Sequence, residues 1–353
     1  MGIDLPGPEK LCEIFSALGF VTTAASMTGV LQSAYKASWA SDATVLLQGE
    51  TGTGKQVLAR AIHALDEKRG SFPFVTVHCS TVSESLAESE LFGHRKGSFS
   101  GAVASRPGLF QAADHGTVFL DDVNDLPLRL QPKLLDALQR GSVRPVGADR
   151  ELHVDVRVIA AANRRLEPLV AEGAFRADLF HRLNVIRLSL PPLRDRREDL
   201  PALVLEFARR YPALYERVES LDSDLLEYLA ACRFEGNVRE LENAVQRALF
   251  MKDEGVTLTR ADWLRQEFDS QTETRTTEEI PKAASLLWLI MLRHELPFPE
   301  MMRKIEGELL RTALKVGGKT RREIAKLLKT SERTLYHKMS AHGIAARPRR
   351  EAS

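Results

Sequence analysis

The residues best suited to chemistry form a glycine-rich loop, GETGTGK, at residues 49–55. The loop follows the apolar run TVLLQ and precedes KQVLARAIHAL, whose apolar residues have helical spacing. A loop between a strand and a helix N-terminus can surround phosphates with backbone N–H groups, while its lysine reaches the β- and γ-phosphates. We therefore expect a nucleotide site made by the following residues: Gly49, Glu50, Thr51, Gly52, Thr53, Gly54, Lys55 and Gln56.

A second feature is the apolar run TVFLDD, residues 117–122, which ends in two acidic residues. Asp121 suits a Mg²⁺ ion that accompanies a triphosphate, and Asp122 suits the polarisation of an attacking water. The phosphate-loop motif usually places Ser or Thr after its lysine as a magnesium ligand, but Gln56 stands there. The metal would therefore depend more on Asp121 and on water. The alternative is a solvated strand end.

The elements that must position these residues alternate along the chain between positions 44 and 190. Apolar runs bounded by Gly or Pro predict buried strands, and the stretches between them predict helices. This alternation is typical of an α/β fold with a parallel sheet. Residues 197–250 are expected to be helical, residues 268–281 a polar linker and residues 282–345 a last helical unit. The predicted strands are TVLLQ, PFVTVHC, TVFLDD, VRVIAAA and VIRLSL.

Charge is unevenly distributed along the 353 residues, although the formal net charge is only +1. Residues 301–350 hold 14 Lys or Arg and 4 Asp or Glu, a net charge of +10, which suits nucleic acid. The three cysteines show no metal or disulfide pattern, and the N-terminus has no signal segment. The most apolar run, LLWLIML, is too short to span a bilayer. We expect a cytoplasmic protein without a membrane partner.

Seven motifs occur in an order that resembles the AAA+ module of sigma-54-dependent bacterial transcription activators, the enhancer-binding proteins. They cover roughly residues 20–250 and are GETGTGK, ESELFGHRKGSFSGA, VFLDD, LQPKLLDALQ, FRADLFHRLNV, LPPLRDRREDL and EGNVRELEN. The segment KTRREIAKLLKTSERTLYHKM resembles their Fis-type helix-turn-helix. The resemblance implies an AAA+ P-loop sheet between helices, a helical lid and an all-α DNA-binding domain. The implied boundaries are a short extension at 1–20, the α/β ATPase at 21–195, the lid at 196–266, a linker at 267–295 and the helix-turn-helix domain at 296–353.

The segment GSFSGA resembles the family's GAFTGA loop, which presents its phenylalanine to sigma-54 when ATP is bound. An aromatic ring on a glycine-bounded loop is by itself a contact point rather than core. A surface loop that does not respond to nucleotide is the alternative. The expected sigma-54 contacts are Gly97, Ser98, Phe99, Ser100, Gly101 and Ala102.

The resemblance also assigns roles to single residues. Arg176 and Arg182 match arginines that reach the ATP site of the neighbouring subunit, where a guanidinium neutralises phosphoryl charge. Arg239 matches the lid arginine that senses the γ-phosphate, although Phe234-Glu235 replaces the usual Trp-Pro before it. Asn163 looks like the first sensor, preceded by Ala where the family has Thr.

Two departures from the family fall close to each other. Asp122 stands where the family has Glu, and His78 stands where it has an Asn that holds the catalytic Glu aside. A displacement of about 1 Å can reduce a rate on the order of 10²-fold. One hypothesis is a matched exchange, because His is longer than Asn and can still donate to a carboxylate. The other hypothesis is a decayed ATPase.

The C-terminal segment shows three apolar stripes, each at helical spacing, among many Lys and Arg residues. The stripes are Leu309, Leu310, Ala313 and Leu314; Ile324, Leu327 and Leu328; and Leu335 and Met339. Short helices with tight turns and basic residues fit a helix-turn-helix, and a solvated basic bundle is the alternative. The expected DNA-binding residues are Arg321, Arg322, Arg333, Thr334, Tyr336, His337 and Lys338.

Together these features predict an activator that binds upstream enhancer DNA and uses ATP, with Mg²⁺, to remodel sigma-54 RNA polymerase holoenzyme for open-complex formation. Arginines that act in trans imply a homo-oligomeric ring, expected as a hexamer, or a mixed ring with a related subunit. Only about 20 residues precede the AAA+ module, so we expect no sensor domain and control by a separate inhibitor protein, a partner subunit or expression level. The alternatives are a DNA-binding regulator with a weak or inactive ATPase, and a protein-unfolding chaperone. A chaperone would not explain GSFSGA or the basic C-terminal segment.

Overall fold

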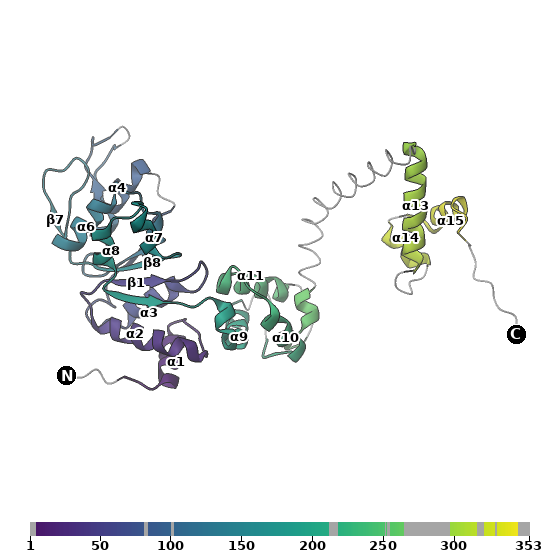
Figure 1. Ribbon diagram of the computed structural model, residues 1–353, viewed down its shortest axis with the longest axis horizontal. Coiled ribbons are helices and arrows are strands. Elements are labelled where there is room, and N and C mark those ends of the chain that lie inside the picture. Colours follow the sequence, from purple (N-terminus) through teal and green to yellow (C-terminus); the bar gives the residue numbers. More distant parts are fainter. Residues whose placement is uncertain are drawn as a thin grey trace. The chain divides into compact units, whose positions relative to one another are not determined.

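The computed structural model forms two units, Met1–Phe268 and Asp269–Ser353, which are described separately (Figure 1). It describes residues 5–80, 84–99, 102–211, 218–250, 252, 255–264, 297–315, 321–328 and 330–344. The expected linker at 268–281 lies outside the described residues. None of the described helices is long and apolar enough to cross a membrane.

A five-stranded parallel sheet forms the centre of the first unit, in the order β2-β5-β8-β1-β9. The five predicted strands and the parallel α/β fold are thereby confirmed. Their continuous apolar runs are explained by burial on both faces, since every residue of β1 and β8 is buried. The strands are β1 (Val45–Gln48), β2 (Phe74–His78), β5 (Thr117–Asp121), β8 (Arg157–Ala162) and β9 (Ile186–Ser189).

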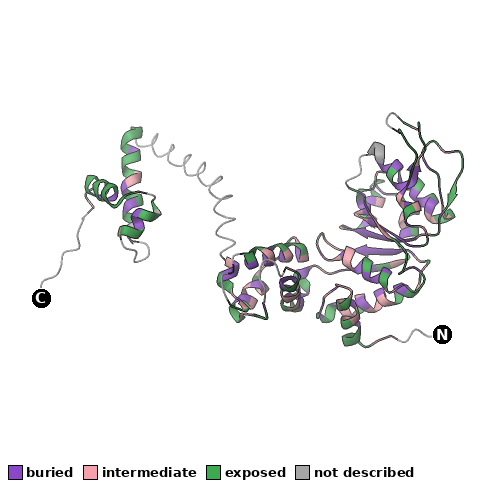
Figure 2. Cartoon of the chain, turned by 180° about the vertical axis from the view of Figure 1, so that it is seen from behind, coloured by how far each residue is buried: buried purple, intermediate pink, exposed green. Residues whose placement is uncertain are grey.

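Helices cover both faces of this sheet (Figure 1). Alternate strand residues point to opposite faces, so Leu47 packs with α1 (Pro8–Ala17), α2 (Thr28–Trp39) and α3 (Lys55–Ala64) in one apolar cluster. Leu46 belongs to the cluster on the other face. The helices there are α4 (Glu84–Phe92), α5 (Leu109–Ala112), α6 (Gln131–Arg140), α7 (Leu166–Ala171) and α8 (Ala177–Leu183). In Figure 2 the central strands are accordingly purple, while the outer helix faces are green.

Two short antiparallel pairs extend from this unit. β3 (Gly93–His94) pairs with β4 (Arg106–Pro107), and β6 (Ser142–Val143) pairs with β7 (Leu152–His153). Val146 links the two, because its N–H donates to the carbonyl of Gly93 at 2.8 Å and its carbonyl accepts from Arg95 N–H at 3.0 Å. The segment that contains Phe99 is therefore anchored at its base to the second hairpin.

A helical lid follows the sheet and has its own apolar cluster. Its helices are α9 (Leu200–Arg210), α10 (Ser223–Ala231) and α11 (Asn237–Phe250), and short 3₁₀ turns lie at Leu193–Asp195 and Arg197–Asp199. The expectation of purely helical structure over 197–250 is wrong at one point, because β10 (Ser220–Leu221) pairs with β11 (Thr257–Leu258). A two-residue strand is too short to produce a period in the sequence.

The second unit contains helices α13 (Phe298–Lys315), α14 (Arg321–Leu327) and α15 (Glu332–Ala341). Its core confirms the predicted burial of Leu310, Ile324, Leu335 and Met339. Two stripe predictions were wrong, since Leu309 is 64% exposed and Leu328 is 48% exposed. Neighbouring helix residues point about 100° apart, so Leu309 cannot share the buried direction of Leu310. The side chains of Ala313, Leu314 and Leu327 lie outside the described set.

Candidate nucleotide-binding site

The loop between β1 and α3 has a backbone that only glycine readily adopts at two positions. Gly52 has φ +80° and Gly54 has φ +100°. A Cβ atom on Gly52 would lie 2.2 Å from the carbonyl oxygen of Gly236, so the lid backbone approaches the loop closely at this point. The glycine spacing that marks the loop in the sequence therefore also permits contact with the lid.

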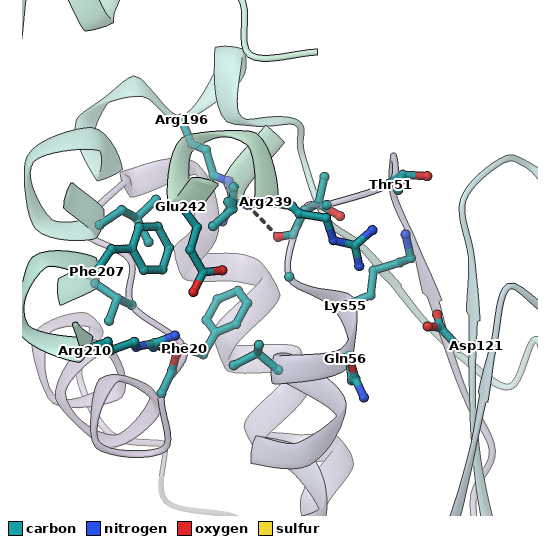
Figure 3. A pocket seen from close by; sticks show the side chains of 18 of the residues that line it. Phe20, Thr51, Lys55, Gln56, Asp121, Arg196, Phe207, Arg210, Arg239 and Glu242 are labelled. Atoms are coloured by element: carbon teal, nitrogen blue, oxygen red, sulfur yellow. Dashed lines mark hydrogen bonds between the residues drawn. The ribbon is translucent and has the colours of Figure 1, made fainter. Parts of the chain in front are cut away.

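A cavity of about 250 Å³ lies against this loop and the lid (Figure 3). One end includes the apolar side chains of Phe20, Val21, Leu203 and Phe207, which suit a flat aromatic ring. The charged side chains of Arg210 and Glu242 lie beside them (Figure 3). The other end brings together residues that the sequence analysis assigned from three distant motifs. They are Thr51, Gly52, Thr53, Gly54, Lys55, Gln56, Asp121, Asp122 and Arg239. Gly49 and Glu50 belong to the loop but are not among the described lining residues.

Lys55 is only 7% exposed and begins α3. Its ammonium group donates to the carbonyl oxygens of Gly49 at 2.7 Å and Glu50 at 3.0 Å. Burial lowers the pKa of Lys55, and the carboxylates of Asp122 and Asp121 partly oppose that shift. The lysine thus lies between the loop and the paired acids, where a phosphate could replace its bonds to the loop carbonyls.

The two acids at the end of β5 have different surroundings. Burial, followed by the negative charge of Asp121, raises the pKa of Asp122 above its ordinary value. Asn163, at the end of the adjacent strand β8, donates from Nδ2 to Asp122 Oδ1 at 3.0 Å. Asp122 has φ +52°, in the left-handed region. Asn124 was not predicted from the sequence; it is 8% exposed and accepts from the backbone N–H of Asn163 at 3.1 Å.

His78 lies closer to the first acid than the sequence analysis expected. The β2–β5 register places His78 directly opposite Asp121, and His78 Nδ1 is 3.4 Å from Asp121 Oδ2. The matched-exchange hypothesis paired His78 with Asp122, and Asp122 accepts a hydrogen bond from Asn163. The difference follows from the parallel ladder, in which opposite residues have their side chains on the same face.

Arg239 extends from α11 into the phosphate end of the cavity (Figure 3). Phe234, which replaces the family's Trp, is 7% exposed within the apolar cluster of the lid. The replacement of Trp by Phe234 therefore affects the packing of the lid, and Arg239 still lies at the cavity.

Arg176 and Arg182 do not occur among the described residues that line this cavity. Arg176 precedes α8 and pairs with Asp178, with Nη2 2.8 Å from Oδ2. Arg182 donates to the carbonyl oxygen of Leu138 at 2.7 Å. Both guanidinium groups therefore lie away from the phosphate end of their own chain.

The loop that begins at His94 carries an exposed phenylalanine, as expected. Phe99 is 37% exposed, and its ring meets the ring of His94 edge-on at 5.1 Å between centroids. Ala102 is only 6% exposed, and its carbonyl accepts from Gly97 N–H at 2.9 Å, so Ala102 closes the turn. Ser98 lies against Gly147 of the second hairpin, and Ser100 and Gly101 lie outside the described residues.

The expected DNA-binding residues lie on or beside α14 and α15. The guanidinium of Arg321 lies 5.6 Å from the ring centroid of Tyr336, and Lys338 pairs with Glu306 of α13. The hydroxyl of Ser331 accepts from Thr334 N–H and caps α15. Arg322 (89% exposed side chain), Arg333 and His337 are exposed.

Two family models match consecutive parts of the chain. Residues 20–189 match the Sigma-54 interaction domain, and residues 194–280 match the AAA+ ATPase lid domain. These matches contain the phosphate loop, the paired acids, the Phe99 loop and Arg239. Residues 281–353, which include α13, α14 and α15, lie beyond both of them.

Individual relatives agree with these matches. Regulatory protein AtoC of Escherichia coli is 39% identical over 315 residues, which are 86% of this chain and 63% of AtoC. A Nif-specific regulatory protein of Bradyrhizobium diazoefficiens is 42% identical over 261 residues, 74% of this chain and 44% of that protein. The chain thus covers less than two thirds of the length of these relatives.

Solved structures agree with the fold. NtrX from Brucella abortus in complex with ADP has a TM-score of 0.64 and 28% identity over 94% of this chain and 71% of NtrX. A second structure of NtrX is a complex with ATP, with a TM-score of 0.63. On the evidence of residues 20–280, the chain belongs to the family of sigma-54-dependent transcription activators.

Proposed function

We propose that this protein binds upstream enhancer DNA and uses ATP hydrolysis to remodel the sigma-54 RNA polymerase holoenzyme for open-complex formation. The observation that carries the proposal is the cavity in which Lys55, Asp121, Asp122 and Arg239 meet. These groups come from the sheet and from the lid, so a nucleotide bound there would contact both.

ATP is the proposed nucleotide. The cavity offers apolar side chains for a base at one end and Lys55 and Arg239 for phosphates at the other, and the related NtrX was crystallised with ATP and with ADP. Carboxylate oxygens are the ligands that Mg²⁺ prefers, so Asp121 fits as its protein ligand, with water in place of the hydroxyl that Gln56 lacks. Bound with ATP, the ion would neutralise charge on the phosphates.

Hydrolysis requires a positioned water and neutralised phosphates. Asp122 would accept a proton from, or polarise, the attacking water, and its raised pKa makes it a stronger base than an ordinary aspartate. Asn163 orients that carboxylate through its hydrogen bond. Lys55 and Arg239 would bind the phosphate oxygens.

Arg176 and Arg182 would complete the site of a neighbouring subunit. Their position away from the phosphate end of their own chain supports action in trans. The proposed assembly is therefore a homo-oligomeric ring, expected as a hexamer, or a mixed ring with a related subunit. A separate inhibitor protein is one proposed route of control.

The remaining partners follow from two exposed regions. Phe99 and its loop would contact sigma-54, since the ring lies outside the cavity and remains 37% exposed. The basic residues of α14 and α15 would bind DNA: Arg321 and Arg322 suit phosphates, while Arg333, Thr334, Tyr336, His337 and Lys338 belong to the proposed recognition helix.

ATP turnover by Lys55→Ala and Asp121→Ala tests the site. Each change should reduce turnover at least about 100-fold, because each removes a charge that contacts the transferring phosphoryl group or its metal. Lys68→Ala serves as a control, since Lys68 is half-exposed and pairs with Asp42 outside the cavity. Turnover is measured over protein concentrations that include those at which rings form.

Two results would contradict the proposal. Normal turnover by either variant would show that the site is wrongly assigned. Absence of turnover in the parent protein at every concentration would favour a DNA-binding regulator with an inactive ATPase, an alternative suggested by Asp122 and His78. DNA binding without turnover would then identify that alternative directly.

A further inference from the structure

Four consecutive residues of the phosphate loop are held by the lid. The carboxylate of Glu50 accepts two hydrogen bonds from the guanidinium of Arg194, at 2.6 and 2.8 Å. The next carbonyl oxygen, on Thr51, accepts from Asn237 Nδ2 at 3.0 Å. The lid therefore contacts both the side chain and the backbone of the loop.

The contacts continue along the loop backbone. The carbonyl oxygen of Gly52 accepts from Val238 N–H at 3.0 Å. That of Thr53 accepts from Arg196 Nη2 at 2.6 Å, and Arg196 lies above the loop in Figure 3. Three successive carbonyl groups are thus engaged by the lid, and none of these bonds uses an N–H group of the loop.

The donors of these bonds are themselves fixed. Asn237 is fully buried, has φ +55° and accepts from Leu193 N–H at 2.8 Å. Arg196 is 1% exposed and lies 3.6 Å from the buried carboxylate of Asp199. Asp199 in turn accepts from the backbone N–H groups of Thr23 and Ala24, at 2.6 and 2.8 Å, next to the apolar end of the cavity.

We propose that Arg194, Arg196 and Asn237 are positioning residues that shape the phosphate loop for nucleotide and make its geometry depend on the position of the lid. The inference rests on the proposed nucleotide function and extends it. A glycine-rich loop loses much conformational entropy when it becomes ordered. Ordering it before nucleotide arrives removes that cost from binding.

The ion pair between Glu50 and Arg194 has a particular electrostatic role. A carboxylate within an anion-binding loop repels phosphate unless a cation neutralises it. Arg194 is positioned to do so and holds the pKa of Glu50 at about 2, so the carboxylate stays ionised and bonded to the lid. Removing Arg194 alone should therefore harm nucleotide binding more than removing both charges.

The test uses the full chain and four variants: Arg194→Met, Glu50→Gln, the double variant and Arg187→Met. Arg187 is the matched control, because it pairs with Glu167 at 2.7 Å with similar exposure but lies outside the cavity. The dissociation constants of ADP and of a non-hydrolysable ATP analogue are measured by calorimetry. Thermal unfolding without nucleotide checks that each protein is folded.

Arg194→Met should raise the dissociation constant of the ATP analogue about three- to tenfold, because a bidentate ion pair at partial exposure is lost. The double variant should bind more tightly than Arg194→Met, and Arg187→Met should bind like the parent. A purely structural role would not produce this recovery, since the double variant lacks the same contact.

The inference would be overturned if the parent and Arg194→Met bind the ATP analogue equally well. It would also be overturned if the double variant binds the analogue no more tightly than Arg194→Met does. If Arg194→Met does not fold, Arg194→Lys is used instead, because it keeps the positive charge but cannot form the bidentate contact. It should weaken nucleotide binding less than threefold. If Arg194→Lys weakens nucleotide binding and the addition of Glu50→Gln does not restore it, the inference is also overturned. A parent that binds neither nucleotide would instead contradict the proposed function.

Discussion

Replacement of Asn163 by alanine should slow ATP hydrolysis without weakening ATP binding. Asn163 donates to Asp122 Oδ1 at 3.0 Å, while it is not among the described residues that line the cavity. A hydrogen bond to a charged group contributes about 1.5–3 kcal/mol. If the attacking water depends on that orientation of Asp122, kcat should fall between about 10-fold and 150-fold.

The pH dependence provides a second measure of the same effect. The hydrogen bond from Asn163 stabilises the ionised carboxylate and so lowers the pKa of Asp122, against the larger effect of burial, which raises it. Without Asn163 the pKa should rise further. More of the base is then protonated at a given acidic pH, so the acidic limb of the kcat profile should move to higher pH.

The assay compares kcat, KM and the dissociation constant of ATP for the parent, Asn163→Ala and Asn243→Ala. Asn243 is an exposed asparagine of the lid helix α11 and serves as the control. A kcat of Asn163→Ala within about threefold of the parent, with an unmoved acidic limb, would refute the role given to Asp122. An equal loss of ATP affinity would instead show a general disturbance of the site.

Three further outcomes are expected. Phe99→Ala should keep normal ATP turnover and DNA binding but lose open-complex formation, measured by permanganate reactivity of promoter DNA; normal open complexes would contradict the sigma-54 contact. The chain truncated after residue 268 should lose DNA binding that the full chain shows with a steep dependence on salt, and tight binding by the truncated chain would place the DNA site elsewhere. His78→Asn and Asp122→Glu should be additive in ATP turnover to within about 0.5 kcal/mol, because His78 lies beside Asp121; stronger coupling would support the matched exchange.

The sheet and its order of elements could be predicted because a strand buried on both faces must be apolar along its whole length. β1 and β8 show this directly, since each is fully buried. The pair β10–β11 could not be predicted, because two residues carry no periodicity and their partners are 37 positions apart. Leu309 shows a similar limit, since adjacent apolar residues on a helix do not reveal which one is buried.

The candidate site residues could be predicted from the sequence, but their hydrogen-bond and ion-pair partners could not. Lys55 and Asp121 could be assigned from the elements beside them, because a strand end in a parallel sheet points to one edge. The bond between Glu50 and Arg194 joins residues 144 positions apart, and nothing local in either segment indicates it. The position of His78 opposite Asp121 is also not evident from either segment, because the β2–β5 register is not encoded within either strand.

The contacts that hold Asp122 bear on the choice between the two hypotheses, a matched exchange and a decayed ATPase. A decayed site would not need to keep its acid oriented, yet Asp122 has φ +52° and accepts a bond from Asn163, whose backbone is fixed by the buried Asn124. Buried polar side chains are costly unless they are bonded, and Asn124 is bonded on both sides, since its Nδ2 also donates to Asp125 at 2.9 Å. These contacts favour an acid that is still positioned for use, with Asn163 as a hydrogen-bond partner. Hydrolysis then depends on whether this shorter acid, one methylene less than the family's glutamate, reaches the attacking water.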